Sequence, residues 1–260
     1  MVWQVERGPW RVTPEALLAL FDGAADAQAA ALTPLAGAER RKRTDRPGQY
    51  ALDLVADEAT VPLLLDAGVA VVSEESGRSG PPDASITVVL DPVDGSTNCS
   101  RGIPYWSISL CAVDTDGPLC ALVANQATGE RTSAIRGAGA WCDGRALRPS
   151  KVQRVEDGVV AVSGMPKHAL PWKQFRALGS AALTLCDVAD GRVDAYLDVL
   201  DDRHAPWDYL GGLLVCREAG AVFEDVRGRE LVTTDPTARR TLLAAATPQL
   251  LDDIRTRTAA

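Results

Sequence analysis

The sequence predicts an α/β protein in which helices and sheets form layers, and three observations support this. Short apolar runs rich in β-branched residues, typical of buried strands, occur at 69–72, 86–90, 159–163 and 193–197. Segments with apolar residues at helix-compatible spacing lie between or beside them, at 14–32, 55–67, 181–189 and 209–219. The stretch 107–148 carries turn signals at Asp116-Gly117, Thr128-Gly129 and Asp143-Gly144, which predict antiparallel strands.

Local signals justify the elements of the first part of the chain. Thr13-Pro14 is typical of an N-cap followed by proline at the first helical position, so an Ala/Leu-rich helix is expected to about residue 32. An arginine-rich connector follows at 39–48. The helix expected at 55–67 stops at Gly68, and the next two strands follow at 69–72 and 86–90.

The pattern changes after Lys151 to alternating strands and helices. Gly220 is the expected stop of the helix at 209–219, and the last pair is a strand at 241–246 and a helix from Pro248. This change predicts two parts, residues 1–150 and 151–260.

Composition excludes several classes of protein. The 260 residues carry a net charge of −8, which argues against nucleic acid or an anionic membrane as a partner. No apolar run is long enough to cross a bilayer, and residues 1–11 lack the apolar core of a signal peptide. The six cysteines show no C-x-x-C spacing, so reduced, mostly buried thiols in a cytoplasmic protein are expected.

The run Asp91-Pro92-Val93-Asp94-Gly95-Ser96-Thr97 is the most informative segment. Its two carboxylates stand at the end of the predicted strand 86–90, where Pro92 favours extended geometry for Asp91. Gly95 lets the backbone turn or approach a ligand closely, and the residues after it offer hydroxyl and N–H groups suited to an anion. The alternative is an ordinary Asp-Gly turn.

Two further acidic segments favour a site over a turn. Ser73-Glu74-Glu75 follows the strand at 69–72, and Trp207-Asp208 opens the helix at 209–219, where the helix dipole favours a carboxylate. Taken singly, these acids could be solvated loop charges or a helix cap.

Taken together, these segments resemble the inositol monophosphatase family of metal-dependent sugar phosphatases. Asp91–Ser96 matches its DP-aliphatic-DG-[TS] motif, residues 73–76 match its Glu-Glu segment, and Trp207-Asp208 through Glu218-Ala219-Gly220 matches its WD…EAGG motif. The resemblance covers roughly residues 45 to 250 and implies an αβαβα five-layer sandwich.

The resemblance implies two Mg²⁺ ions and a third, weaker one that leans on Glu74, with Mn²⁺ as a substitute. The first ion would be held by Glu74, Asp91 and the carbonyl of Val93, and the second by Asp91, Asp94 and Asp208, so that Asp91 bridges them. Charge repulsion supports this reading independently. At ~4 Å and an effective dielectric of ~20, each pair of like charges costs roughly 4 kcal/mol, and all-oxygen ligands favour Mg²⁺ over zinc.

The resemblance also implies the remaining site residues. Glu74 and Asp91 are expected to be catalytic, together with Ser96, which replaces a threonine that orients the attacking water, and Asp57, its acidic partner. Substrate contacts are expected from two further sets of positions. The phosphate would be bound by Asp94, Gly95, Ser96 and Thr97, and the alcohol by Gly179, Ser180, Ala181 and Asp198. Arg176 would contact the substrate or a neighbouring subunit, or form a surface ion pair.

The function predicted is hydrolysis of a small polyol or sugar phosphate by direct attack of metal-activated water, without a covalent enzyme intermediate. Inositol 1-phosphate is the leading candidate substrate. Fructose 1,6-bisphosphate, histidinol phosphate and a nucleotide 3′-phosphate are the alternative substrates. Asp91 and Asp94 stand three residues apart, which argues against a haloacid-type phosphatase. A glycosidase is a further alternative, and activity without metal would favour it. The alternative from a different functional class is a non-catalytic relative that binds metal.

The chain also departs from the family's pattern. Residues 46–54 depart from the family's flap, which lies near the third metal. A few extra residues at 199–206, between Asp198 and Asp208, are expected to border the leaving group and so to bear on substrate choice. His204 either lines the substrate mouth or is solvated in a loop, and Cys99 stands near the phosphate loop as a bystander or a redox switch. The resemblance implies inhibition by lithium and a homodimer.

Overall fold

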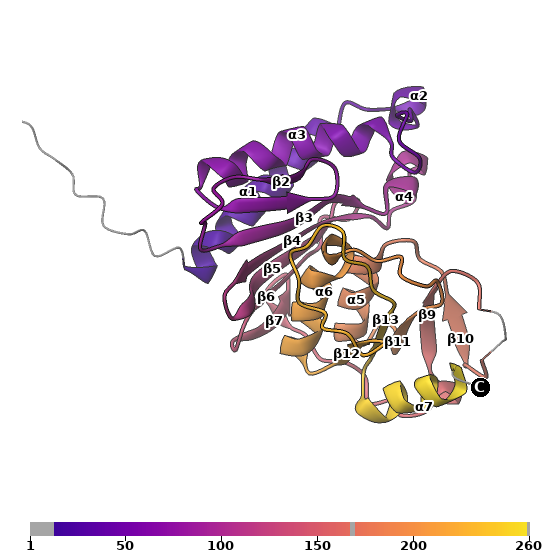
Figure 1. Ribbon diagram of the computed structural model, residues 1–260. Coiled ribbons are helices and arrows are strands. Elements are labelled where there is room, and N and C mark those ends of the chain that lie inside the picture. Colours follow the sequence, from indigo (N-terminus) through magenta and orange to yellow (C-terminus); the bar gives the residue numbers. More distant parts are fainter. Residues whose placement is uncertain (1–12, 167–169, 259–260) are drawn as a thin grey trace, which may run out of the picture.

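The computed structural model describes residues 13–166 and 170–258 (Figure 1). The segment 1–11, for which the sequence predicts no signal peptide, lies outside the described residues. Two long helices, α1 (Pro14–Leu32) and α3 (Ala51–Asp66), form the outermost layer, and the short α2 (Gly37–Arg40) connects them. The hydroxyl of Thr13 accepts a hydrogen bond from the N–H of Ala16 at 3.2 Å, which confirms the predicted N-cap.

The second long helix begins earlier than predicted. Its start at Ala51, rather than at Val55, follows from the side chain of Asp53, whose Oδ2 accepts a hydrogen bond from the N–H of Tyr50 at 2.8 Å. The cap adds a turn that apolar spacing alone does not indicate.

An eight-stranded sheet forms the second layer, in the order β2-β1-β3-β4-β5-β6-β7-β8. Only β1 and β3 are parallel neighbours; the rest of the sheet is antiparallel, as the turn signals in 107–148 predicted. The strands are β1 (Ala70–Ser73), β2 (Gly77–Ser79), β3 (Thr87–Asp94), β4 (Ser107–Asp114), β5 (Gly117–Asn125), β6 (Arg131–Ile135), β7 (Gly139–Cys142) and β8 (Arg145–Ala146).

A five-stranded sheet forms the fourth layer, in the order β10-β9-β11-β13-β12. Here β10 and β11 run parallel to β9, whereas β13 runs antiparallel to both β11 and β12. The strands are β9 (Val159–Ser163), β10 (Gln174–Arg176), β11 (Ala195–Asp198), β12 (Val222–Asp225) and β13 (Leu242–Ala245), and the 3₁₀ turn η1 (Val155–Asp157) precedes them.

Helices α5 (Ala181–Ala189) and α6 (Pro206–Ala219) pack between the two sheets, and α7 (Pro248–Thr258) covers the far face of the second sheet (Figure 1). This order of layers confirms the five-layer sandwich. The largest apolar cluster lies in this middle layer and joins both sheets. No described helix combines the length and the apolar character that a membrane span requires. All six cysteines are buried and unpaired.

A close approach of α5 and α6 holds the middle layer together. A Cβ atom on Gly212 of α6 would lie 2.5 Å from the Cβ and 2.7 Å from the Cδ1 of Leu185 on α5, closer than carbon atoms can pack. Only glycine therefore fits at this point of the helix–helix contact.

We expect Gly212→Ala to lower the free energy of unfolding by about 1–3 kcal/mol, because the extra methyl overpacks the core. Gly23→Ala is the matched control: Gly23 also lies inside a helix, but no atom comes within 4 Å of the added Cβ. That variant should be neutral or stabilised by about 0.5–1 kcal/mol. Urea unfolding of both variants measures the difference, and equal effects would contradict the packing argument.

Candidate metal and substrate site

The acidic run at 91–94 is part of β3 rather than a turn after it. The pairing of β3 with β4 continues to Asp94 opposite Ser107, with a shift of register between Asp91 and Asp94. Asp91 Oδ1 accepts a hydrogen bond from the N–H of Val93 at 3.0 Å. The side chain of Gln28, fully buried on α1, donates to the carbonyl of Pro92 at 2.5 Å. The bulge is thus stabilised by a hydrogen bond within β3 and by a second one from α1 in the outer helix layer.

Gly95 ends the strand in a left-handed conformation, with φ of 90°. A Cβ there would lie 3.0 Å from the carbonyl oxygen of Gly179, so the two backbones meet at this point. A helix, α4 (Ser96–Arg101), follows where the sequence indicated only a loop. Ser96 and Thr97 occupy its first turn, and Thr97 Oγ1 lies 3.4 Å from the hydroxyl of Tyr50.

Three carboxylates from separate elements converge on the bulge. Glu74 follows β1, Asp91 lies on β3 and Asp208 lies in the first turn of α6, and ligand oxygens of all three lie within 4.8 Å of one another. Burial and the charges of Asp208 and Glu75 raise the pKa of Glu74 to about 9. Burial and the charges of Glu74 and Asp94 raise the pKa of Asp91 well above its ordinary value.

Asp94 belongs to the same cluster but has partners of its own. Its carboxylate accepts hydrogen bonds from the hydroxyl of Ser180 and from the N–H groups of Ala181 at 3.3 Å and Ala182 at 2.7 Å, at the start of α5. Burial raises the pKa of Asp94 to about 6, although these donors act in the opposite direction. Asp94 therefore connects the first sheet to α5.

The donor set fits a divalent cation. In residues 13–166 and 170–258, none of the ion pairs formed by lysine or arginine involves Glu74, Asp91, Asp94 or Asp208. Buried and half-buried carboxylates that lie this close without such a partner are stable together only when protonated or when a cation lies among them. Oxygen donors alone suit a hard ion such as Mg²⁺. Glu74, Asp91, Asp94 and Asp208, with the carbonyl of Val93, are the groups that would hold it.

The structure places the other predicted catalytic residues close by but pairs them differently. Asp57, buried on α3, accepts a hydrogen bond from the hydroxyl of Ser73 at the end of β1. In the described part of the chain no hydrogen bond joins Asp57 to Ser96, the pair that the resemblance implied.

Two acidic residues beside the cluster add to the set named from the sequence. Asp53 is buried, its Oδ1 has no hydrogen-bond partner, and burial raises its pKa to about 7. Glu75 accepts from Gln49 and pairs with Arg46 at 3.3 Å, and Arg46 also reaches the carbonyl of Glu74 at 3.4 Å. The segment 46–54 therefore borders the cluster, although it departs from the family's pattern.

A cavity of about 320 Å³ opens beside the carboxylates, between Asp94 and Asp208 on one side and β9 and β11 on the other. Gly179, Ser180 and Ala181, which the resemblance named for the alcohol half of the substrate, line it. Arg176 does not; it is exposed on β10 and bonds the side chain of Gln174 at 2.6 Å. The full lining is Asp94, Val162, Ser163, Gly164, Ala177, Leu178, Gly179, Ser180, Ala181, Thr184, Tyr196, His204 and Asp208.

His204 is a buried part of this cavity and not a solvated loop histidine. Its Nδ1 lies 2.8 Å from Asp198 Oδ2, and its Nε2 lies 2.9 Å from the hydroxyl of Tyr196. Burial alone would lower the pKa of the imidazole, but the hydrogen bond to Asp198 and the charge of Asp208 outweigh it and raise the pKa. Asp198, expected to contact the substrate, is absent from the cavity lining.

Comparison with known proteins agrees with this geometry. The model of the inositol monophosphatase family matches residues 20–259. An Archaeoglobus fulgidus protein named fructose-1,6-bisphosphatase/inositol-1-monophosphatase is 34% identical over 185 residues, which cover 70% of this chain and 71% of that protein. Nus factor SuhB of Escherichia coli is 30% identical over 207 residues, covering 71% of this chain and 76% of its own.

Solved structures show the same fold. A Pyrococcus horikoshii protein described as having similarities for inositol-1 monophosphatase superposes with a TM-score of 0.85 at 26% identity, over 94% of this chain and 98% of that one. The layered α/β fold thus matches that of inositol monophosphatase-type structures. The chain belongs to the inositol monophosphatase family, which confirms the resemblance seen in the sequence.

The raised pKa of Glu74 predicts how metal-free protein responds to pH. The folded state holds this proton up to a pH of about 9, whereas the unfolded chain releases it near the ordinary value of 4.5. The stabilisation is therefore complete below pH 4.5 and is lost as the pH rises through 9. With EDTA present, we expect the Tm of the wild type to fall more steeply between pH 5 and pH 9 than the Tm of Glu74→Gln. This range lies between the ordinary pKa of Glu74, 4.5, and its raised pKa of about 9.

Magnesium should reverse this trend, because it binds the deprotonated carboxylates. The Mg²⁺-induced rise in Tm is expected to grow with pH in the wild type and to vanish in Glu74→Gln. Glu58→Gln, which removes an exposed glutamate of α3, is the charge-matched control and should behave as the wild type. A rise in Tm of equal size in Glu74→Gln would exclude Glu74 as a ligand.

Proposed function

We propose that the protein is a Mg²⁺-dependent phosphomonoesterase that hydrolyses a small polyol or sugar phosphate, with inositol 1-phosphate as the leading substrate. The observation that carries the proposal is the convergence of Glu74, Asp91 and Asp208 within 4.8 Å at the edge of a cavity. The cluster and the cavity share Asp94 and Asp208, so a phosphate ester in the cavity would meet the carboxylates directly.

When bound, the ions would supply Lewis acidity and an activated nucleophile at neutral pH. The residues of the chain would position the reactants. Gly95, Ser96 and Thr97 offer backbone N–H groups and hydroxyls beside the cluster, and these would bind the phosphate. Asp94, fixed by the start of α5, keeps its carboxylate turned toward the cavity. Asp57 would help to orient the attacking nucleophile by holding nearby hydroxyl groups, such as that of Ser73, through hydrogen bonds.

The cavity supports a small, hydroxylated alcohol as the other half of the substrate. Its lining combines polar side chains, among them Ser163, Thr184 and Tyr196, with apolar ones such as Val162 and Leu178. A polyol presents hydroxyls at its edge and C–H groups on its faces, so both kinds of lining find a partner. The A. fulgidus relative is named for both fructose 1,6-bisphosphate and inositol 1-phosphate. Fructose 1,6-bisphosphate, histidinol phosphate and a nucleotide 3′-phosphate therefore belong in the same substrate panel.

The name of the E. coli relative supports a second candidate. It is called a Nus factor and not a phosphatase, so a binding or regulatory role that uses the same fold is the alternative. The two candidates differ in one measurable property: only the enzyme releases phosphate, and only in the presence of a divalent ion.

Phosphate release from the panel, with Mg²⁺ or with EDTA, tests the proposal. We expect turnover only with Mg²⁺, and we expect Asp91→Asn to reduce kcat by several orders of magnitude, because Asp91 is one of the groups that would hold the metal. Asp116→Asn, on the exposed turn between β4 and β5, is the matched control with unchanged rate. Turnover in EDTA, or near-normal turnover of a folded Asp91→Asn protein, would refute the proposal.

Lithium sensitivity, a cytoplasmic location and a homodimer belong to the same proposal. If Li⁺ competes at a Mg²⁺ site, LiCl should lower kcat where equal concentrations of KCl do not. Light scattering on the eluted protein would show whether the mass is that of one chain or two. Full activity in LiCl would argue against close functional kinship with the lithium-sensitive members of the family.

A further inference from the structure

We infer that the hydroxyl of Tyr196, positioned by His204 and Asp198, binds a hydroxyl group of the substrate's alcohol half and thereby selects the phosphate ester. This inference rests on the proposed function and specifies its substrate subsite. The contacts that support it lie on β11 and on the segment 199–206, which the sequence placed near the leaving group without assigning a contact to any of its residues.

Asp198 cannot contact the substrate directly. Its side chain is fully buried, with 0% of its surface exposed. Its Oδ2 bonds His204 Nδ1 at 2.8 Å, and its Oδ1 accepts a hydrogen bond from the N–H of Leu200 at 3.0 Å. Both oxygens are thus engaged inside the protein, and the position that the resemblance assigned to substrate binding here supports another side chain.

Tyr196 and His204, in contrast, both line the cavity that contains Asp94 and Asp208. The three side chains form a hydrogen-bonded row, with His204 in the middle and Tyr196 at the end, 2.9 Å from His204 Nε2. Because the carboxylate of Asp198 accepts, Nδ1 of His204 carries a proton. The direction of the second hydrogen bond then depends only on whether Nε2 is also protonated.

In either case the tyrosine hydroxyl, with one donor and two acceptor positions, can bond a substrate hydroxyl in addition to His204 and the side chain of Ser163 on β9. When His204 is neutral, Nε2 accepts the proton of Tyr196, and the phenolic oxygen can accept from a substrate hydroxyl. When His204 is charged, Nε2 donates to Tyr196, and the phenol can donate to the substrate. A substrate hydroxyl can serve as donor or acceptor, so it fits both states.

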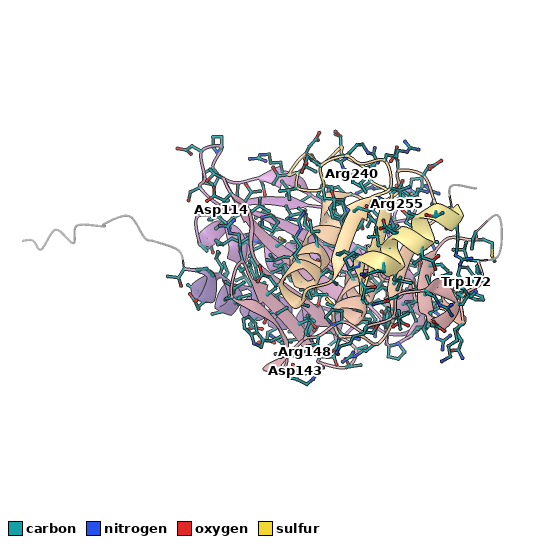
Figure 2. All side chains as sticks on the ribbon, turned by 90° about the horizontal axis from the view of Figure 1, so that it is seen from below. Asp114, Asp143, Arg148, Trp172, Arg240 and Arg255 are labelled. Atoms are coloured by element: carbon teal, nitrogen blue, oxygen red, sulfur yellow. The ribbon has the colours of Figure 1, made fainter. Side chains whose placement is uncertain are left out.

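The segment 199–206 fixes His204 in this row. Asp202, in a left-handed conformation with φ of 51°, accepts hydrogen bonds from Arg227 and from Arg229, each at 2.6 Å. Its N–H donates to Thr241 Oγ1 at 2.9 Å. The backbone of His204 pairs with that of Arg240, which is labelled in Figure 2, through hydrogen bonds of 3.2 and 2.8 Å. The extra residues therefore form an anchored loop that carries His204 into the cavity.

The same segment also packs against the cavity lining at Gly164. Leu200 packs on Gly164, where a Cβ would lie 2.6 Å from Leu200 Cγ, and Gly164 lines the cavity. The residues that distinguish this loop thus determine both a polar contact and the width of the alcohol subsite.

The test compares two esters in one enzyme. Inositol 1-phosphate, or another hydroxylated ester that the panel favours, can bond Tyr196, whereas p-nitrophenyl phosphate has no alcohol hydroxyl. We expect Tyr196→Phe to lower kcat/KM about tenfold for the hydroxylated ester, mainly through KM, because a hydrogen bond to a buried group is lost. For p-nitrophenyl phosphate it should change by less than about twofold, the precision of such free-energy comparisons.

His204→Gln tests the positioning role. It should lower the kcat/KM of the hydroxylated ester relative to that of p-nitrophenyl phosphate, as Tyr196→Phe does. The double variant should show no larger fall in this ratio than either single variant, because the row acts as a unit. Tyr209→Phe is the matched control: it removes a buried hydroxyl that donates to the carbonyl of Leu231 at 2.8 Å, outside the cavity lining. This variant should keep the wild-type ratio.

The outcomes separate the two proposals. An unchanged ratio in Tyr196→Phe, or an equal loss for both esters, would overturn the subsite while Mg²⁺-dependent hydrolysis of p-nitrophenyl phosphate by the wild type still supports the phosphatase. Additive losses in the double variant would overturn the positioning role of His204. A wild-type protein that hydrolyses neither ester would overturn the proposed function and the subsite together.

Discussion

The convergence of several like charges at one largely buried point is the constraint on which the rest of the structure depends. Glu74, Asp91 and Asp208 come from three elements and meet without an ion pair to lysine or arginine in the described part of the chain. Such an arrangement opposes folding unless protons or cations compensate it. Its persistence requires that the surrounding contacts leave the side chains no alternative position. The bulge of β3, held by Gln28 on one side and by its own Asp91–Val93 hydrogen bond on the other, provides this.

Asp94 shows how the same constraint joins the two sheets. Its carboxylate lies among like charges, yet it is bonded by Ser180 and by two N–H groups at the start of α5. A helix start offers unpaired N–H groups and a favourable dipole, so it can balance a negative charge that the first sheet alone could not hold. The contact also brings Gly179 against Gly95. The phosphate-binding segment, the alcohol cavity and the carboxylates are thus assembled by one electrostatic contact between the halves of the chain.

Much of this assembly could be predicted from local sequence, and the exceptions have physical causes. Strands and helices with strong apolar patterns appeared where expected, and α5 has the predicted bounds. The earlier start of α3 depends on a side-chain cap at Asp53, and α4 follows a left-handed glycine, so neither shows in apolar spacing. Glu74, Asp91 and Asp208 are far apart along the chain, so local sequence could not predict that they meet. The family resemblance did predict it. The pairings of Asp57 with Ser73 and of Asp198 with His204 depend on which way a side chain points, which spacing alone does not determine.

The carboxylates and the alcohol cavity obey different constraints, and this bears on how substrate choice can vary within one fold. The carboxylates are determined by short motifs whose geometry is set by a bulge, a helix start and a buried charge, so few changes are tolerated there. The cavity wall at Tyr196 and His204 depends instead on a surface loop held by ion pairs of Asp202 with Arg227 and Arg229. Exposed pairs of this kind contribute little to stability, so the loop can change in length and sequence at small cost. A change in the loop before Ala205, whose N–H bonds Asp208 Oδ2 at 2.6 Å, would move His204 and the wall at Gly164 while leaving the carboxylates in place. Such a change would alter the alcohol that fits while the chemistry at phosphorus stays the same.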